Sequence, residues 1–287
     1  MRWEGNEQSN NVEDRRGGGG GFGIGGGTVG IGTIVIALIG SWFFGVSPST
    51  ILSLLSGGSP AQVQQAPSHP PANDRETQFV RTVLGFTETT WSKIFKANGA
   101  TYQPPVLVLY DGKTPTEGCG TGQAAVGPFY CPADRKVYID LTFFNMMQQR
   151  FKVGGEFTQA YVIAHEVGHH VQNLLGISGK VDSMRSRLSE TEANALSVRV
   201  ELQADCFAGV WAYHTNEAKQ IIEQGDVESA LAAASAIGDD ALQRQSRGEV
   251  VPDSFTHGTS AQRVRWFTKG LQTGSVEQCN TFEARQL

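Results

Sequence analysis

The five residues His165-Glu166-Val167-Gly168-His169 constrain this chain more than any other feature of its sequence. Residues four apart on a helix lie on the same face, so His165 and His169 can both direct a ring nitrogen at one ion about 2.0 to 2.1 Å away. Glu166 is rotated by about 100° from His165, which keeps it beside the ion without making it a ligand. There it can accept a proton from metal-bound water. The spacing predicts a zinc site on a helix.

The neighbours of this motif predict that its helix is buried. Residues 162–164, Val167 and Val171 are uncharged, and charged or imidazole groups on a buried helix need partners. The alternative is a helix whose histidines are satisfied by hydrogen bonds in the core. His170 points away from the shared face, and we interpret it as a core histidine or one that supports the site without binding the ion.

A third protein ligand must come from elsewhere in the chain, because a catalytic zinc usually has three protein ligands and an open position. No histidine follows within residues 172–176, so a carboxylate is required. Glu201 supplies it on a second, mostly apolar helix. Asp205 lies one turn later on the same face, where it can accept the other ring N–H of a ligating histidine. Glu190 and Glu192, nearer the start of that helix, are rival ligands.

The composition excludes other classes of function. A net charge of −5 with no long basic run gives no electrostatic footprint for nucleic acid. A nucleophilic cysteine is also disfavoured, because Cys206 lies in an apolar helical run with no histidine motif to activate it.

Changes of composition along the chain predict four segments. Residues 1–27 are polar and then almost pure glycine, which predicts a disordered tail. Residues 28–46 are uncharged and long enough for one transmembrane helix, and their aromatic end would lie at the lipid interface. Residues 47–73 are rich in Pro, Gly, Ser and Gln, as in an extended linker. Residues 74–287 would then form the folded domain. A buried core helix and a cleaved signal peptide are the alternatives for residues 28–46.

Basic residues predict the orientation of this membrane segment. Arg2, Arg15 and Arg16 precede it, whereas residues 47–74 contain no Lys or Arg. The positive-inside rule then places the N-terminus in the cytoplasm and the folded domain outside it.

Within residues 74–287 the apolar pattern predicts strands first and helices afterwards. Strands are expected at Val106–Tyr110 and Val137–Phe143, where apolar runs or alternation occur. The expected helices cover 73–98, 157–175, 189–214, 226–247 and 259–269, the first ending before Gly99 and the last at Gly270. Capping boxes begin two of them, Ser189 with Glu192 and Thr259 with Gln262. This order indicates an α+β fold with a small antiparallel or mixed sheet.

The four cysteines allow three complete pairings. None forms a C-x-x-C pair. Cys119 and Cys131 bracket a glycine-rich loop, so we expect a local disulfide in an oxidising compartment, with Cys206 and Cys279 as a second pair. Four reduced thiols are the alternative.

Longer stretches carry a family resemblance. HEVGHH with ELQAD resembles the gluzincin arrangement, in which H-E-x-x-H on one helix is completed by E-x-x-A-D on the next. MRWEG, NVEDRR, GPFYCPADRKVYIDLTFF and FTHGTSAQRVRWF resemble the bacterial putative neutral zinc metallopeptidase family over nearly the whole chain. The resemblance implies a zincin-like fold in which the strand at Val137–Phe143 is an edge that pairs with substrate backbone.

The resemblance also draws attention to His257 and Arg263. Membrane-associated gluzincins carry Thr-His-Pro with a later Arg, and this chain has Thr256-His257-Gly258. A hydrogen-bonding or cationic group near the metal would stabilise the oxyanion of the tetrahedral intermediate. The alternative is a loop histidine with an arginine near a helix cap. His69 and His214 are interpreted as solvent-facing.

The sequence therefore predicts a membrane-anchored, zinc-dependent endopeptidase that hydrolyses peptides or proteins with Glu166 as general base. It would be a single-pass protein of the bacterial inner membrane, with a cytoplasmic N-terminus and a periplasmic or other extracytoplasmic catalytic domain. The alternative is a non-catalytic zinc-containing envelope protein that recruits a partner along an edge strand.

Overall fold

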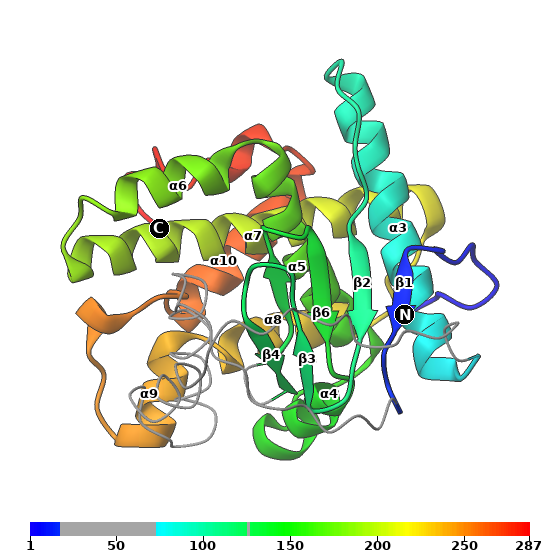
Figure 1. Cartoon of the computed structure of the whole chain (residues 1–287), viewed down its shortest axis with the longest axis horizontal. Helices are drawn as coiled ribbons and strands as arrows, with labels where there is room; N and C mark the ends of the chain where they lie inside the picture. Colours follow the sequence, from blue (N-terminus) through cyan, green and yellow to red (C-terminus); the bar gives the residue numbers. More distant parts are fainter. Residues whose placement is uncertain (18–72, 125–126) are drawn as a thin grey trace. The chain divides into compact units, whose positions relative to one another are not determined.

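The computed structural model describes residues 1–17, 73–124 and 127–287, which divide into two compact units (Figure 1). The first unit comprises Met1–Asn10, Asp74–Pro104 and Met146–Leu287, and the described residues of the second are 11–17, Asn73, 105–124 and 127–145. All strands of the described residues belong to the second unit, and nearly all of the helical residues belong to the first. The α+β class is confirmed, with strands and helices gathered in different units.

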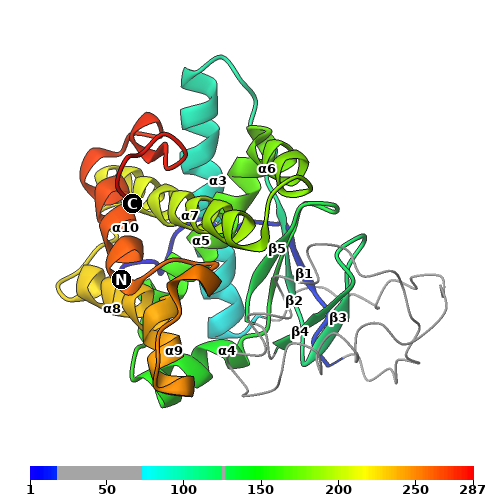
Figure 2. The ribbon, with the colours of Figure 1, turned by 90° about the vertical axis from the view of Figure 1, so that its left-hand side faces the viewer.

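Long helices form the first unit. In Figures 1 and 2, α7 (Glu190–Lys219) lies beside α5 (Glu156–Leu174) and α10 (Ser260–Thr273). The other helical elements are α3 (Arg75–Ala97), a π-helix (Met147–Phe151), α6 (Ile177–Arg185), α8 (Asp226–Ala236), α9 (Asp239–Arg247) and 3₁₀ turns at Pro252–Ser254 and Glu277–Cys279.

Two helices begin as their sequences predict. The side chain of Ser189 caps α7 and that of Thr259 caps α10, and both capping boxes are complete. Each box satisfies two of the N–H groups that a helix start leaves without an intrahelical partner.

Three helix boundaries differ from the prediction. One is the end of α7, which lies at Lys219 instead of near His214. The expected helix over 226–247 is two helices, because the chain is extended at Gly238, which caps the start of α9. The last long helix does not end at Gly270 but continues to Thr273. Gly270 allows close helix packing, since a Cβ there would lie 2.0 Å from the carbonyl oxygen of Cys206. A glycine at position 270 is therefore explained by the contact with α7 and not by the end of the helix. The residue that caps the end of α10 is Gly274.

The second unit contains a four-stranded sheet in the order β1-β2-β6-β5. Its strands are β1 (Val12–Asp14), β2 (Val106–Leu109), β6 (Lys136–Ile139) and β5 (Phe129–Cys131). The pairs β1–β2 and β2–β6 are parallel, and β5–β6 is antiparallel. A separate hairpin joins β3 (Lys113–Pro115) to β4 (Thr121–Gln123).

The expected edge strand at Val137–Phe143 is wrong in two respects. β6 pairs with a neighbour on each side, so its backbone groups are already bonded and it is not an edge. The strand also ends at Ile139, because Asp140 accepts hydrogen bonds from the backbone N–H and hydroxyl of Thr142, where α4 (Thr142–Met146) begins. The alternating pattern beyond Ile139 continues into a short helix.

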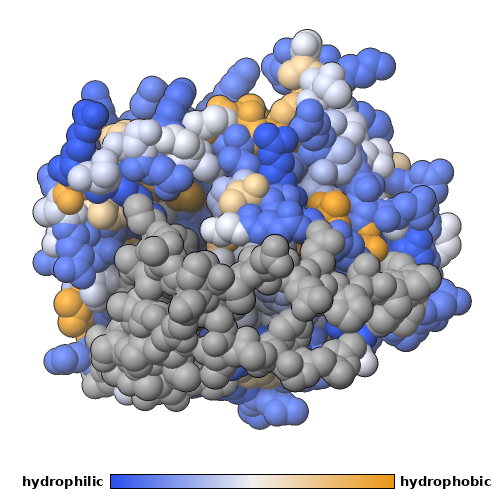
Figure 3. Space-filling view, in the orientation of Figure 1, coloured by the Kyte–Doolittle hydropathy of each residue, from blue (hydrophilic) through white to orange (hydrophobic). Residues whose placement is uncertain are grey.

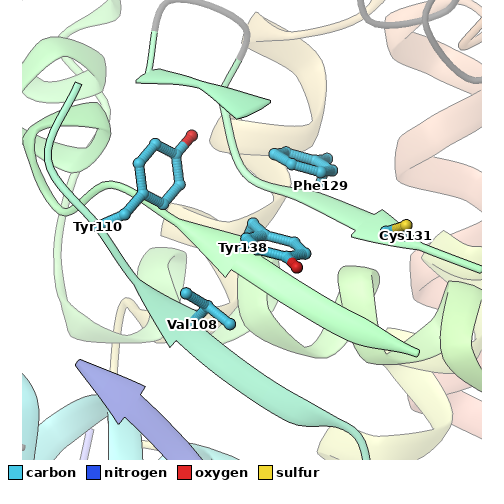
Figure 4. Close-up of a cluster of buried hydrophobic side chains, with 5 residues drawn as sticks. All are labelled: Val108, Tyr110, Phe129, Cys131 and Tyr138. Atoms are coloured by element: carbon cyan, nitrogen blue, oxygen red, sulfur yellow. The ribbon is translucent and has the colours of Figure 1, made fainter. Parts of the chain in front are cut away.

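A cluster of buried side chains forms the core of the second unit (Figure 4). The rings of Phe129 and Tyr138 stack with centroids 4.9 Å apart across the β5–β6 pair. The disulfide between Cys119 and Cys131 lies at the edge of this cluster. Val108 and Tyr110 on the neighbouring chain segment complete it.

The described surface in Figure 3 is mostly hydrophilic, with hydrophobic residues in small separate groups. Among the described residues, the large hydrophobic side chains with substantial exposure are Leu175, Met184 and Val251. Isolated exposed hydrophobic residues of this kind are ordinary on a soluble protein surface.

Residues 1–17 are ordered, so the predicted tail is wrong for this part of the chain. Trp3 is 4% exposed, and its ring packs edge-on against Phe79 on α3 with centroids 5.4 Å apart. The backbone N–H of Ser9 donates to the carbonyl of Arg81 at 2.9 Å. Residues 12–14 then form β1. The prediction was wrong because the composition of residues 1–27 is dominated by the glycines at its end. Residues 1–17 contain apolar and ion-paired side chains that pack in the fold.

The N-terminal arginines have partners in the fold, which removes their value as topology signals. Arg15 donates to Glu13 at 2.7 Å and to Thr114 at 3.1 Å, and Arg16 is paired with the buried Asp14 at 2.7 Å. In addition, Met1–Asn10 and Asp74–Pro104 belong to one compact unit. A folded unit lies on one side of a membrane, so we expect Met1–Asn10 and Asp74–Pro104 to lie on the same side.

None of the helices in the described parts of the chain is long and apolar enough to span a bilayer. The expected membrane segment at residues 28–46 lies outside the described residues, as do the linker at 47–72 and His69.

We predict that residues 1–10 and α3 are accessible from the same side of the membrane. Single substitutions Glu7→Cys and Lys93→Cys place thiols at two exposed positions of the first unit. All four native cysteines are in disulfides, so only the new thiol reacts with a membrane-impermeant maleimide. In intact spheroplasts both variants should be labelled, or both protected. Labelling of one variant alone would contradict the shared packing.

Candidate metal centre

The candidate metal centre lies between two buried helix segments of the first unit. His165 and Glu166 on α5 are 6% and 8% exposed. Gly168, in the middle of the motif, brings α5 against α7, since a Cβ there would lie 3.0 Å from the carbonyl oxygen of Ala204. This close approach places the α5 histidines beside Glu201.

Three side chains converge in the geometry of a metal site. His165 Nε2 lies 3.2 Å from one carboxylate oxygen of Glu201, and His169 Nε2 lies 3.6 Å from the other. Ligand atoms around a tetrahedral zinc ion with bonds of about 2.0 to 2.1 Å lie about 3.4 Å apart. The potential ligand atoms of the three residues all lie within 4.8 Å of one another. Two imidazoles and a carboxylate with this spacing fit a zinc ion.

The rival carboxylates lie elsewhere. Glu190 and Glu192 are exposed in the first turn of α7, and Glu192 completes the capping box there. They do not belong to the cluster that could hold an ion. The structure therefore brings Glu201, and not these two, to the histidines.

Asp205 orients the first histidine. Its Oδ1 lies 2.8 Å from His165 Nδ1 and accepts from the hydroxyl of Tyr161 at 2.6 Å. Because the carboxylate is an acceptor, Nδ1 carries the proton and Nε2 is left free to bind the ion. Tyr161 was not identified from the sequence, where it reads as one more buried aromatic residue on an apolar helix.

Arg263 lies against Asp205 and not at an open position beside the ion. Its Nε donates to Asp205 Oδ2 at 2.8 Å and its Nη2 to Oδ1 at 2.9 Å, a bidentate pair in which both partners are buried. Nη2 also reaches the Tyr161 hydroxyl at 3.2 Å. Arg263 therefore forms its ion pair with the carboxylate that orients His165.

The ionisation of these carboxylates follows from their neighbours. Burial acts to raise the pKa of Asp205, but the charge of Arg263 and then of His165 outweighs it and lowers the pKa to about 2. Burial also opposes ionisation of Glu201, but the nearby histidines, led by His169, hold its pKa well below its usual range. Burial raises the pKa of Glu166, which suits a proton acceptor.

His257 lies on a loop that Asp239 organises. Asp239 Oδ2 accepts from three consecutive backbone N–H groups, those of residues 256–258, at 2.7, 2.6 and 2.9 Å. Its Oδ1 lies 3.3 Å from His257 Nδ1. Gly258 has a φ of +89°, which proline cannot adopt because its ring fixes φ near −65°. Glycine in place of proline therefore reflects a different turn, held by Asp239.

The remaining candidates have structural partners. His170 is fully buried and its Nε2 lies 2.6 Å from the Gln103 carbonyl, as expected of a core histidine. His214 is half-buried and lies 2.8 Å from the Gly274 carbonyl, so its prediction as solvent-facing is wrong. Cys206 is joined to Cys279, which removes it as a nucleophile. Both expected disulfides are present.

The geometry of this site is typical of one class of metal centre. An H-E-x-x-H helix completed by a glutamate on the next long helix is the arrangement of zinc metallopeptidases of the gluzincin type. The family described as "Putative neutral zinc metallopeptidase" matches residues 1–282, and the chain belongs to that family. Its cofactor is accordingly Zn²⁺.

Relatives of similar length occur in distant bacteria. "Uncharacterized protein YpfJ" of Escherichia coli (strain K12) is 50% identical over 98% of this chain and 99% of the relative. "Uncharacterized protein Rv2575" of Mycobacterium tuberculosis (strain ATCC 25618 / H37Rv) is 42% identical over 73% of each chain. No solved structure matches the chain.

We predict that Arg263→Met lowers the free energy of unfolding by about 3 to 5 kcal/mol, because it leaves the buried Asp205 carboxylate without its cationic partner. Arg265→Met is the matched control on the same helix, exposed and expected within about 0.5 kcal/mol of the parent. Denaturant unfolding in the presence of a chelator measures both without a contribution from metal. Equal stability of the two variants would contradict the assignment of Arg263 to Asp205.

Proposed function

We propose that this protein is a zinc-dependent endopeptidase that hydrolyses peptide bonds, with Glu166 as the general base. One observation carries the proposal: the ligand atoms of His165, His169 and Glu201 converge within 4.8 Å, with Glu166 buried next to the first ligand on the same helix. A site that only held a structural ion would use a fourth protein ligand instead of leaving a position open. It would also have no need of a buried carboxylate beside that position.

In the proposed reaction the water and the carbonyl are activated by the ion, and the proton is transferred by Glu166. Zn²⁺, when bound, supplies a Lewis acid that polarises the scissile carbonyl and lowers the pKa of a water molecule. Glu166 accepts the proton of the attacking water and passes it to the leaving amine. Its raised pKa, caused by burial, brings its basicity closer to that of a proton shuttle near neutral pH. This mechanism requires no covalent intermediate.

His257 is the proposed oxyanion donor. Burial acts to lower its pKa, but the negative charges of Glu201 and then of Asp239 raise it. The Thr256 hydroxyl, at 2.9 Å, and Asp239 Oδ1, at 3.3 Å, lie beside Nδ1 and leave Nε2 for a hydrogen bond to a developing negative charge. Arg263 does not take this role, because its guanidinium is committed to Asp205.

Three further features belong to the proposal. We assign the helical unit to a zincin-like fold. We place the protein at the extracytoplasmic face of the bacterial inner membrane. Two disulfides support that location, since they form and persist in oxidising environments. Residues 1–10 then lie on the same side as the rest of the first unit.

We predict that Glu166→Gln retains zinc but loses hydrolysis, because it removes proton transfer and no ligand. Glu201→Gln should instead lose zinc or bind it far more weakly, because only two imidazoles remain as strong ligands. Zinc content by elemental analysis and cleavage of an unstructured protein such as casein measure the two properties separately. Glu192→Gln, at an exposed position of the same helix as Glu201, is the control and should change neither.

Different results would favour other interpretations. Zinc retained by Glu201→Gln but lost in Glu192→Gln would overturn the ligand set. Zinc bound with no Glu166-dependent cleavage of any substrate would favour the alternative, a non-catalytic envelope protein that binds a partner.

A further inference from the structure

A chain of side-chain amides begins at the second histidine of the motif. His169 Nδ1 lies 2.9 Å from Gln172 Oε1, about one turn along α5. The amide nitrogen of Gln172 donates to the Val200 carbonyl at 2.8 Å and to Gln203 Oε1 at 3.0 Å. Gln203 in turn donates to the Cys279 carbonyl at 3.1 Å. Four hydrogen bonds thus link His169 to two backbone carbonyls.

The two carbonyls fix the direction of every hydrogen bond in this chain. A carbonyl oxygen can only accept, so Val200 and Cys279 require the amide nitrogens of Gln172 and Gln203. Reversing the Gln172 amide would place its oxygen against the Val200 carbonyl and its nitrogen against His169. Such a reversal in a buried site would leave polar groups without partners, at a cost of about 1 to 3 kcal/mol for each group. The oxygen of Gln172 therefore faces His169.

The Cys279 carbonyl, which is the last acceptor in this series of hydrogen bonds, lies in a buried and cross-linked segment. Cys279 is joined to Cys206 on α7, and both are fully buried. Thr281 donates to the Arg199 carbonyl at 2.6 Å, and the Arg199 side chain donates back to the Thr281 carbonyl. The C-terminal segment is thereby fixed to the helix that carries Glu201. The Cys279 carbonyl is held in place to receive Gln203.

We propose that Gln172 and Gln203 are positioning residues for the metal centre. Gln172 accepts the Nδ1–H of His169, which sets the ring's tautomer and leaves Nε2 free for the ion. Gln203 holds the Gln172 amide in the orientation that this requires. The inference rests on the proposed zinc site and adds to it. His165 obtains the same tautomer from a carboxylate, whereas His169 obtains it from a neutral amide anchored to backbone.

The test compares substitutions that keep or remove the acceptor at position 172. Gln172→Met removes it at similar size and should weaken zinc binding by about 10 to 100-fold. Gln172→Glu keeps an acceptor toward Nδ1 but loses the hydrogen bonds donated to Val200 and Gln203, so it should be less stable than Gln172→Met and still bind zinc more tightly. Gln203→Met leaves the Val200 contact of Gln172 intact and should have an intermediate effect. Gln159→Met, the same change at a partly exposed position of α5, is the control.

The measurement is the zinc dissociation constant of the purified full chain by competition with a chromophoric chelator. Thermal unfolding of the metal-free proteins reports separately on the fold. A general loss of stability would lower affinity in Gln172→Glu as much as in Gln172→Met, and that result would overturn the proposal. Unchanged affinity in both Gln172→Met and Gln203→Met would also overturn it. If the parent itself bound no zinc, the proposed function would fail instead, so the two failures are distinguishable.

Discussion

The bidentate pair between Asp205 and Arg263 is the interaction on which the metal centre depends. Asp205 is completely buried, and an isolated carboxylate there would bind a proton instead of remaining charged. Arg263 keeps it ionised, and the ionised carboxylate then holds His165 and Tyr161. A buried ion pair of this kind gives little net stability compared with apolar packing. Its contribution is to fix the tautomer and direction of His165, one of the proposed metal ligands.

The two histidines illustrate two solutions to one requirement. In the proposed site each presents Nε2 to the ion with Nδ1 protonated, so each needs an acceptor beside Nδ1. His165 has a carboxylate, which raises the basicity of the ring and costs a buried charge that Arg263 must balance. His169 has the Gln172 amide, which adds no charge and takes its direction from backbone carbonyls. A second carboxylate behind His169 would have required a second buried cation.

The sequence predicted the parts of the fold and site that depend on local spacing. The i, i+4 histidines, the Glu201 and Asp205 pair and both capping boxes lie on single helices, so their geometry follows from helix periodicity. The sequence did not indicate Tyr161, Gln203 or Asp239, because their hydrogen bonds join separate elements. Tyr161 on α5 bonds to α7, Gln203 on α7 to the turn at Glu277–Cys279, and Asp239 on α9 to the loop before α10. The interior place of β6 was missed for the same reason, since strand order is a long-range property.

The N-terminal stretches MRWEG and NVEDRR have a structural explanation that composition concealed. Trp3 fills a buried site against α3, and Val12–Asp14 adds a parallel strand to the sheet. Parallel neighbours require a long connection between strands, and residues 15–105 provide it here. The arginines that suggested a cytoplasmic tail pair with carboxylates of the same unit. A charge bias next to an apolar segment therefore indicates topology only when the charges have no partners in the fold, and Arg15 and Arg16 do not meet that condition.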